Sequence, residues 1–506
     1  MADHTHTSQK PDAKERCATG VEGLDAALCG GLPPRRLYLV KGNPGVGKTT
    51  LALQFLLEGA RRGETCVYFT LSETKEEMEV VAASHGWNLE PIHLFELSTF
   101  EDELLGETDH TFFRPSEVDL ERTTKVMLAE IERANPSRVV FDSLSEMRLL
   151  SETSLRYRRQ ILAFKRFFNE RNATVLFLDD CTAEKHDLQI ESMAHGVISL
   201  HRYTSEYGAV RRQVIIEKIR GAKFREGRHD LILDTGGMVV FPRLMAAEHH
   251  AAFERKPFPL GIPEIDTMLG GGLDRGTSSM FMGAPGTGKS TLAMKYAHTA
   301  AERGEKCQIF VFDETVGILL DRARRLGMDL EPHVAAGRIK VRQIDPAEIS
   351  PGELAHEIRH SVLHDGIQMV VIDSINGYLN AMPEERYLNL QLHELLTFLN
   401  QQGVISIMML AQQGLLGTMQ STIDLTYLAD SVLLFRYYED HGAVKQAMSV
   451  IKKRSGEPHD RAIREMKVGS GGVHVGPALT DMQGVLTGVP IFHGAASPSG
   501  RLEISQ

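Results

Sequence analysis

The chain lacks several features that mark specialised protein classes. Its five cysteines include no CxxC pair, so no disulfide framework or zinc ribbon is indicated. No uninterrupted apolar run reaches the roughly 18 residues that a membrane helix needs, and the polar N-terminus has no apolar signal core. These absences predict a cytoplasmic protein with no membrane partner.

Basic residues are outnumbered by acidic residues. Lys and Arg number 56 against 67 Asp and Glu, which gives a net charge of −11. This balance repels phosphodiester backbones unless the basic residues gather on one face, so it disfavours a nucleic-acid partner. Hydrophobic residues make up 42% of the 506 residues, which is ordinary for a globular protein and excludes wholesale disorder.

An internal duplication organises the chain. GVEGLDAALCGGL at 20–32 reappears as GIPEIDTMLGGGL at 261–273, an offset of 241 (261 minus 20). Between the copies, residues 245–259 break both helical and strand periodicity, which predicts a linker. The predicted parts are a flexible leader at 1–15, a first domain at 16–247, a second domain at 248–490 and a short polar tail at 491–506.

Short apolar strands alternate with amphipathic helices in both copies. This pattern predicts an α/β fold of two doubly wound domains, each a mostly parallel sheet covered by helices. Each copy then ends in a β-rich stretch, at 212–221 and 447–456. The strands expected before these stretches are 36–42, 66–72, 138–143 and 174–180 in the first copy, and 279–284, 308–314, 369–374 and 405–412 in the second.

Each copy has a phosphate-binding loop between its first strand and the helix that follows. GNPGVGKT and GAPGTGKS both match GxxxxGK[ST], in which backbone N–H groups wrap the phosphates, the lysine reaches the terminal phosphates and the hydroxyl binds Mg²⁺. A tight turn without a ligand is the alternative, but two matches at corresponding positions favour ATP and Mg²⁺. The predicted nucleotide-binding residues of the loops are Gly42, Asn43, Pro44, Gly45, Val46, Gly47, Lys48, Thr49, Thr50, Gly283, Ala284, Pro285, Gly286, Thr287, Gly288, Lys289, Ser290 and Thr291.

Carboxylates follow the apolar strands. Asp142 and Asp373 end RVVFD and MVVID, where a carboxylate can anchor Mg²⁺ together with the loop hydroxyls of Thr49 and Ser290. A cap on the next turn is the alternative for these aspartates. The catalytic candidates Glu73 and Glu314 leave the strand after the first helix of each copy, where a carboxylate can orient or deprotonate a nucleophile. A solvated surface charge is the alternative for these glutamates.

A mixed basic and aromatic segment at 157–168 could be taken for a nucleic-acid surface. However, Tyr157, Ile161, Phe164 and Phe168 recur on one helical face. We therefore expect them to pack on the sheet.

Together these motifs resemble the KaiC family of RecA-superfamily ATPases. The resemblance runs from about 17 to 490 and includes the lead-in segments, which are the repeated stretches at 20–32 and 261–273. It also includes both phosphate loops, the acidic residues after the second strand and HDRAIRE at 459–465. It implies two tandem RecA-like domains, a homohexameric double ring with ATP held between subunits, an ATPase in the first ring and a serine/threonine autokinase in the second. It also implies a KaiB-like partner.

The resemblance assigns further residues. The Glu-Glu pair of the family appears as Ser72-Glu73 in the first copy and as Asp313-Glu314 in the second, which places Asp313 at the general base of the kinase. Four basic residues match those that reach the γ-phosphate of the neighbouring subunit, with solvated strand residues as the alternative: Lys218, Arg220, Lys452 and Arg454.

The phosphorylated pair of the family aligns with Thr426 and Tyr427. A tyrosyl oxygen lies farther from the backbone than a threonyl one, so the same in-line geometry cannot serve both residues. Thr426 is the better phosphoryl acceptor, and Ser421 and Thr422 are nearby alternative acceptors. A purely structural packing role is the alternative for Tyr427. The polar residues after Pro490 do not resemble the charged tail that binds KaiA in the family, so KaiA-type stimulation is not expected.

The sequence therefore predicts a KaiC-like timer that hydrolyses ATP and phosphorylates itself. Two alternatives remain at this point. One is a hexameric scaffold gated by nucleotide that acts only as an ATPase. The other is a RecA-like DNA-processing motor, which the net charge and the lack of a cysteine-rich finger disfavour.

Overall fold

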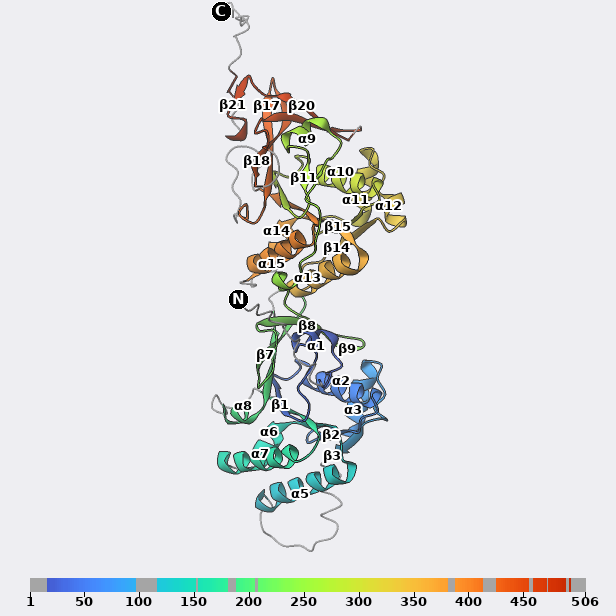
Figure 1. Ribbon diagram of the computed structural model, residues 1–506, viewed down its shortest axis with the longest axis vertical. Helices are drawn as coiled ribbons and strands as arrows, with labels where there is room; N and C mark the ends of the chain where they lie inside the picture. Colours follow the sequence, from blue (N-terminus) through green and yellow to red (C-terminus); the bar gives the residue numbers. More distant parts are fainter. Residues whose placement is uncertain are drawn as a thin grey trace, which may run out of the picture. The chain divides into compact units, whose positions relative to one another are not determined.

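The computed structural model divides the chain into two compact units. The first ends at Arg243 and the second begins at Leu244 (Figure 1). The leader, most of the tail, Ser421 and Thr422 lie outside the part of the chain that the structure describes. That part comprises residues 16–96, 116–151, 153–180, 188–204, 208–380, 387–412, 425–454, 458–470, 472–487 and 491–492.

A nine-stranded sheet forms the centre of the first unit, in the order β3-β2-β4-β5-β1-β6-β7-β8-β9. The strands from β3 to β6 run parallel, and the last three pair antiparallel. Because β1 lies between β5 and β6, its carboxyl end meets those of its parallel neighbours at one edge of the sheet. The strands are β1 (Leu37–Gly42), β2 (Cys66–Thr70), β3 (His93–Glu96), β4 (Arg138–Asp142), β5 (Thr174–Asp180), β6 (Gly196–Tyr203), β7 (Arg211–Ile219), β8 (Arg228–Asp234) and β9 (Gly237–Phe241).

Helices cover both faces of this sheet. Tyr38 and Val40 of β1 belong to the core cluster with α1 (Glu22–Ala27), α2 (Lys48–Arg61) and α3 (Lys75–Ser84). Leu37 and Leu39 belong to the opposite cluster, because successive strand residues point to opposite faces. The helices of that cluster are α5 (Ser116–Ala134), α6 (Leu144–Leu150), α7 (Ser154–Asn169) and α8 (Leu188–Met193). All four predicted face residues of α7 are buried there, which confirms their role in packing.

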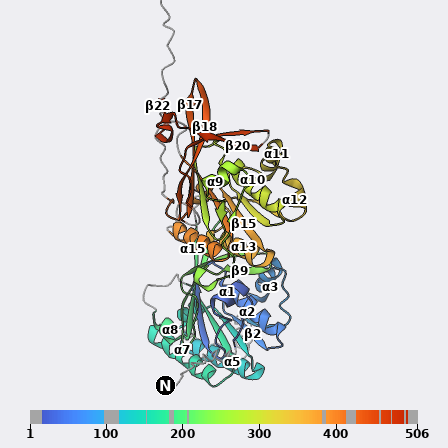
Figure 2. The ribbon, with the colours of Figure 1, turned by 45° about the horizontal axis from the view of Figure 1, so that its top comes forward.

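The second unit repeats this arrangement, with the sheet order β14-β13-β15-β16-β12-β17-β18-β19-β20 (Figure 2). Its strands β14 to β17 again run parallel and the last three antiparallel. The two sheets confirm the predicted fold class of tandem α/β domains. The strands are β12 (Ser278–Gly283), β13 (Lys306–Val311), β14 (Ile339–Gln343), β15 (Ile367–Asp373), β16 (Ile405–Ala411), β17 (Ser431–Asp440), β18 (Ala443–Lys453), β19 (Arg464–Gly469) and β20 (Gly472–Ala478).

Two core clusters also enclose the second sheet. One contains residues of α9 (Pro263–Met268), α10 (Lys289–Glu302) and α11 (Val316–Arg325), and α12 (Glu331–Ala335) packs against it. The other contains residues of α13 (Pro351–His360), the turn η2 (Ser361–Asp365), α14 (Ile375–Asn380) and α15 (Leu388–Gln401). Two short strands, β21 (Met482–Gln483) and β22 (Ile491–Phe492), and the turn η3 (Val485–Thr487) follow near the end of the chain.

The predicted linker contains regular structure that periodicity did not reveal. Within 245–259, Ala246–Glu248 form a short turn, η1, and Pro257–Phe258 form β10, which pairs with β11 (Leu273–Asp274). Phe258 is buried in the core of the second unit. A two-residue strand is too short to show the alternation by which strands are recognised in a sequence.

A buried cation anchors the lead-in segment of each unit. In the first, the Arg138 guanidinium is fully buried and donates to the carbonyls of Ala18 and Phe55 at 2.7 and 2.6 Å, and to Glu64 at 2.5 Å. In the second, the buried Lys453 ammonium donates to the carbonyl of Leu269 and forms an ion pair with Asp274. An arginine in the first unit and a lysine in the second thus make comparable hydrogen bonds to backbone carbonyls in or next to this segment.

The Arg138→Met variant is expected to destabilise the first unit by about 3–5 kcal/mol, because two carbonyls and a carboxylate lose a buried partner. Trp87, the single tryptophan of the chain, lies in this unit, so its fluorescence during urea unfolding reports the change. The matched Lys453→Met variant should leave the midpoint of that fluorescence transition in place. An unshifted midpoint in Arg138→Met would refute the anchoring role.

Candidate nucleotide-binding sites

The two phosphate loops depend on glycines at the starts of α2 and α10. Gly47 has φ +104°, and a Cβ there would lie 2.9 Å from the Leu233 side chain. Gly288 has φ +95°, and a Cβ there would lie 2.7 Å from Met466. At both positions the positive φ favours glycine over any residue with a side chain. As a result, each loop can turn its backbone N–H groups toward a bound anion at a helix N-terminus.

The loop lysines are buried in both units but differ in their partners. Lys48 Nζ donates to the carbonyls of Gly42 and Asn43 at 2.8 and 3.2 Å and forms an ion pair with Asp180 at 2.6 Å. Lys289 Nζ donates to the carbonyls of Gly283 and Ala284 at 2.8 and 2.7 Å.

Burial also changes the acidity of Lys289. It lowers the pKa of the ammonium group to about 8, although the nearby Asp373 carboxylate acts in the opposite direction. A triphosphate placed against this group would favour its protonated form.

The predicted metal ligands come together as hydroxyl and carboxylate pairs. Thr49 Oγ1 donates to Asp142 Oδ2 at 3.0 Å, and the Tyr68 hydroxyl donates to the same oxygen at 2.6 Å. Burial raises the pKa of the Asp142 carboxyl, and these two hydrogen bonds oppose the rise. In the second unit Asp373 is likewise hydrogen-bonded by Ser290, and burial raises its pKa.

These oxygen donors fit Mg²⁺. Within the described ranges, no cluster of three or more His, Cys, Asp or Glu side chains is arranged to hold a metal. Mg²⁺ commonly uses one or two carboxylates together with water and substrate phosphates. Thr49 with Asp142, and Ser290 with Asp373, would therefore hold the ion beside a bound triphosphate.

The two glutamates predicted to be catalytic lie in different electrostatic surroundings. Glu73 is half-buried, and burial raises the pKa of its carboxyl, assisted by the Asp142 and Glu77 charges. Burial also raises the pKa of the Glu314 carboxyl, but Arg322 opposes this through an ion pair at 2.7 Å. A carboxyl with a raised pKa is better suited to accept a proton near neutral pH.

The residues preceding these glutamates also differ. Asp313 Oδ2 accepts a hydrogen bond from Ser374 at 2.8 Å, so its carboxylate is held in one orientation. The corresponding Ser72 is exposed and carries no carboxylate. Only the second unit has two adjacent acidic residues at this position.

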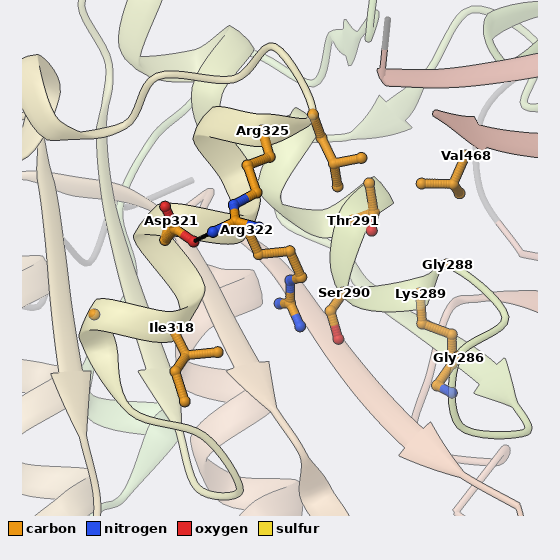
Figure 3. A pocket seen from close by; sticks show the side chains of 12 residues that line it. Gly286, Gly288, Lys289, Ser290, Thr291, Ile318, Asp321, Arg322, Arg325 and Val468 are labelled. Carbon is orange, nitrogen blue, oxygen red and sulfur yellow. Dashed lines mark ion pairs between the residues drawn. The ribbon is translucent and has the colours of Figure 1, made fainter. Parts of the chain in front are cut away.

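A cavity of about 710 Å³ opens beside the phosphate loop of the second unit. Its walls include Gly286, the residues from Gly288 to Thr291, and residues of α11 (Figure 3). This volume lies within the usual range of small-molecule sites.

The four predicted trans-acting cations contact the segments that precede β6 and β17. Lys218 Nζ donates to the carbonyl of Glu191, and Arg220 donates to that of Ser192 at 2.6 Å. Lys452 Nζ donates to the carbonyl of Thr426 at 2.7 Å. The side chain of Arg454 is about half exposed and lies 4.0 Å from the Asp430 carboxylate.

Comparison with known proteins identifies the family. The model of the KaiC ATPase family matches residues 17–245 and 258–480. The chain belongs to the KaiC family. The resemblance drawn from the motifs is thus confirmed, including two tandem RecA-like domains of the KaiC ATPase type.

Several curated KaiC proteins are similar over nearly the full length. The circadian clock protein KaiC3 of Synechocystis sp. is 26% identical over 494 residues, which cover 96% of each chain. The circadian clock oscillator protein KaiC of Parathermosynechococcus lividus is 25% identical, over 93% of this chain and 87% of its own. The circadian clock protein KaiC2 of Synechocystis sp. is 25% identical, over 94% and 83%. No helix among the described residues of this KaiC-family chain is long and apolar enough to cross a membrane.

The sequence motifs do not point to three polar residues of these KaiC-type sites. Asp180 ends β5 and pairs with Lys48, Tyr68 lies within β2 and binds Asp142, and Arg322 lies two helical turns after Glu314. The double aspartate at the end of TVLFLDD was the usable signal for Asp180, because parallel strands end at one sheet edge. Tyr68 occupies an apolar-looking strand position that gives no such signal.

The affinity of the second site for ATP is expected to fall above about pH 8. The measurement uses the Lys48→Ala variant, in which the first loop is disabled. Below the Lys289 pKa of about 8 the ammonium is already protonated, so Kd should be flat. Above it, binding must also add a proton, so Kd should rise by up to about tenfold per pH unit.

Adenosine is the control ligand for this measurement, because it has no phosphate for Lys289 and its Kd should not follow the same curve. A constant ATP Kd from about pH 7 to about pH 9.5 would contradict the assignment.

Proposed function

We propose that this KaiC-family ATPase hydrolyses ATP at both nucleotide sites and transfers a phosphoryl group to Thr426. The proposed assembly is a cytoplasmic homohexameric double ring, with ATP and Mg²⁺ at the subunit interfaces. One contact supports the autokinase most directly, namely the hydrogen bond from Lys452 Nζ to the Thr426 carbonyl. It joins the predicted acceptor to a residue that in the family reaches the γ-phosphate of the neighbouring subunit.

The first unit provides an internal comparison for this contact. Lys218 pairs with Val197 across β6 and β7, as Lys452 pairs with Val432 across β17 and β18. In each unit the lysine donates to the carbonyl of the residue six positions before its valine partner. This residue is Glu191 in the first unit (197 minus 191) and Thr426 in the second (432 minus 426). This hydrogen bond is thus common to both units, but only the second has a hydroxyl there.

The transfer can be written with its bonds balanced. Thr426 Oγ1 forms a bond to the γ-phosphorus, the bond from that phosphorus to the β–γ bridging oxygen breaks, and ADP leaves. The hydroxyl proton passes to the carboxylate of Asp313 of the partner subunit, the proposed general base. Bound Mg²⁺ supplies positive charge that offsets the charge of the phosphate oxygens.

Tyr427 is the weaker acceptor candidate. Its side chain is 55% exposed, and its hydroxyl lies at the end of an aromatic ring. A geometry that brings Thr426 Oγ1 in line with the γ-phosphate cannot also place that hydroxyl there.

At the first site, Glu73 is the proposed residue that orients the attacking water. Ser72 offers no second carboxylate there, so we expect slower turnover than a paired acidic site would support. The curated relatives are named as circadian clock proteins, and we propose a clock-like or signalling timer role with a KaiB-like partner.

Incubation with Mg²⁺ and γ-labelled ATP should leave label on the wild-type protein. The Thr426→Ala variant should lose this label because it has no acceptor oxygen, whereas Thr426→Ser and Tyr427→Phe should retain it. Asp313→Asn should lower the labelling rate by about 100-fold or more, as expected for the loss of a general base. Free phosphate with no labelled wild-type protein would reduce the proposal to an ATPase-only ring.

Trans action predicts complementation between two inactive variants. Lys452→Ala subunits keep the phosphate loop, and Lys289→Ala subunits keep the trans cation and its acceptor. In a reassembled equal mixture, about a quarter of interfaces should combine both intact halves, so labelling should recover to about that fraction.

The position of the label sharpens this test. Because Thr426 is tethered to Lys452 in the same chain, label should appear only on Lys289→Ala subunits, which a size tag can distinguish. Label confined to the Lys452→Ala subunits would show transfer within one subunit and overturn the trans arrangement.

A further inference from the structure

One cation at the second nucleotide site has no role in the function proposed above. Arg322 lies in the last turn of α11, lines the cavity beside the phosphate loop, and donates to Glu314 Oε1 at 2.7 Å. Its guanidinium is directed toward the side chain of Ser290 (Figure 3). The guanidinium therefore contacts the Glu314 carboxylate and faces the loop residue Ser290.

The neighbouring arginines of α11 have other partners. Arg324 and Arg325 both form ion pairs with Asp321, at 2.7 and 2.8 Å, on the same helix. Figure 3 shows the Arg325 guanidinium turned toward Asp321, whereas Arg322 extends toward the loop. Of these three guanidinium groups, Arg322 is the one that contacts a carboxylate of the candidate site.

The charged groups of the first site have different partners. The repeat offset carries Arg322 onto Val81, an apolar residue of α3 that packs against the core of the first unit. There the carboxylate of Asp180 pairs with the loop lysine Lys48. In the second unit the residue at the end of the corresponding strand is Ala411, and Lys289 is held by two carbonyls.

These arrangements have different consequences for a triphosphate. At the first site, phosphate oxygens must replace Asp180 as the partner of Lys48. At the second, they meet Lys289 and an additional guanidinium. A guanidinium has five N–H donors, so Arg322 can keep its bond to Glu314 and donate to a phosphate oxygen at the same time.

We propose that Arg322 is a phosphate-binding residue of the second nucleotide site, supplied by the same subunit that supplies the loop. This inference rests on the proposed binding of ATP at that site and extends it. Arg322 differs from Lys452 and Arg454 because it acts within its own subunit. It also gives the second site a positive charge that the first site lacks at the repeat-equivalent position.

The test measures nucleotide affinity in the full-length Lys48→Ala background, where only the second loop is intact. Arg322→Gln keeps much of the side-chain length but removes the charge, so the ATP Kd should rise about tenfold or more. Arg322→Lys retains the charge and should recover a large part of that loss. The Kd of adenosine should stay within about twofold, because adenosine has no phosphate.

The matched control is Arg324→Gln, which removes a neighbouring guanidinium of the same helix that pairs with Asp321. Its ATP Kd should remain within about twofold of the background. If Lys48→Ala itself binds no ATP, the proposed function fails at the second site. If it binds ATP and Arg322→Gln binds ATP equally well, or weakens ATP and adenosine alike, the assignment of Arg322 is overturned.

Discussion

A buried ammonium group at the end of the central strand of each sheet sets the geometry of the candidate sites. Lys48 and Lys289 each turn back to donate to two carbonyls at the end of the preceding strand. This closes the loop and leaves the helix N-terminus open. The parallel strands end at the same edge, so the carboxylates that terminate β4 and β15, each one strand removed from the central strand, lie beside the loop hydroxyls without a separate scaffold.

Duplication preserved this framework while the charges around it diverged. In the first unit a carboxylate engages the lysine, and in the second an arginine engages the glutamate. Both arrangements bring opposite charges together at the partly buried edge of the sheet. The two sites therefore share a fold but start from different charge distributions when nucleotide arrives. That difference supports the proposal that the first domain only hydrolyses ATP and the second also transfers a phosphoryl group to the protein.

Much of the fold and part of each site could be predicted from the sequence. The 241-residue offset and the strand patterns indicated two parallel sheets, and the loop motifs located the glycines, the lysines and the hydroxyl and carboxylate pairs. The Asp180 to Lys48 and Tyr68 to Asp142 contacts join residues far apart in the chain, and no local pattern encodes them. β10 was missed because two residues carry no period, although Phe258 is buried in the core of the second unit.

The residue that corresponds to Thr426 in the first unit is Glu191, whose carboxylate forms an ion pair with Lys41 at 2.5 Å. That carboxyl group is part of the amino acid itself, so no phosphatase can remove it. A phosphothreonine would bring about −1.5 to −2 charges to the equivalent place in the second unit, but reversibly. Under the proposed phosphorylation of Thr426, the first domain would resemble a version of the second with a fixed acidic residue at this position, and only the second would gain a charge there that can be removed again.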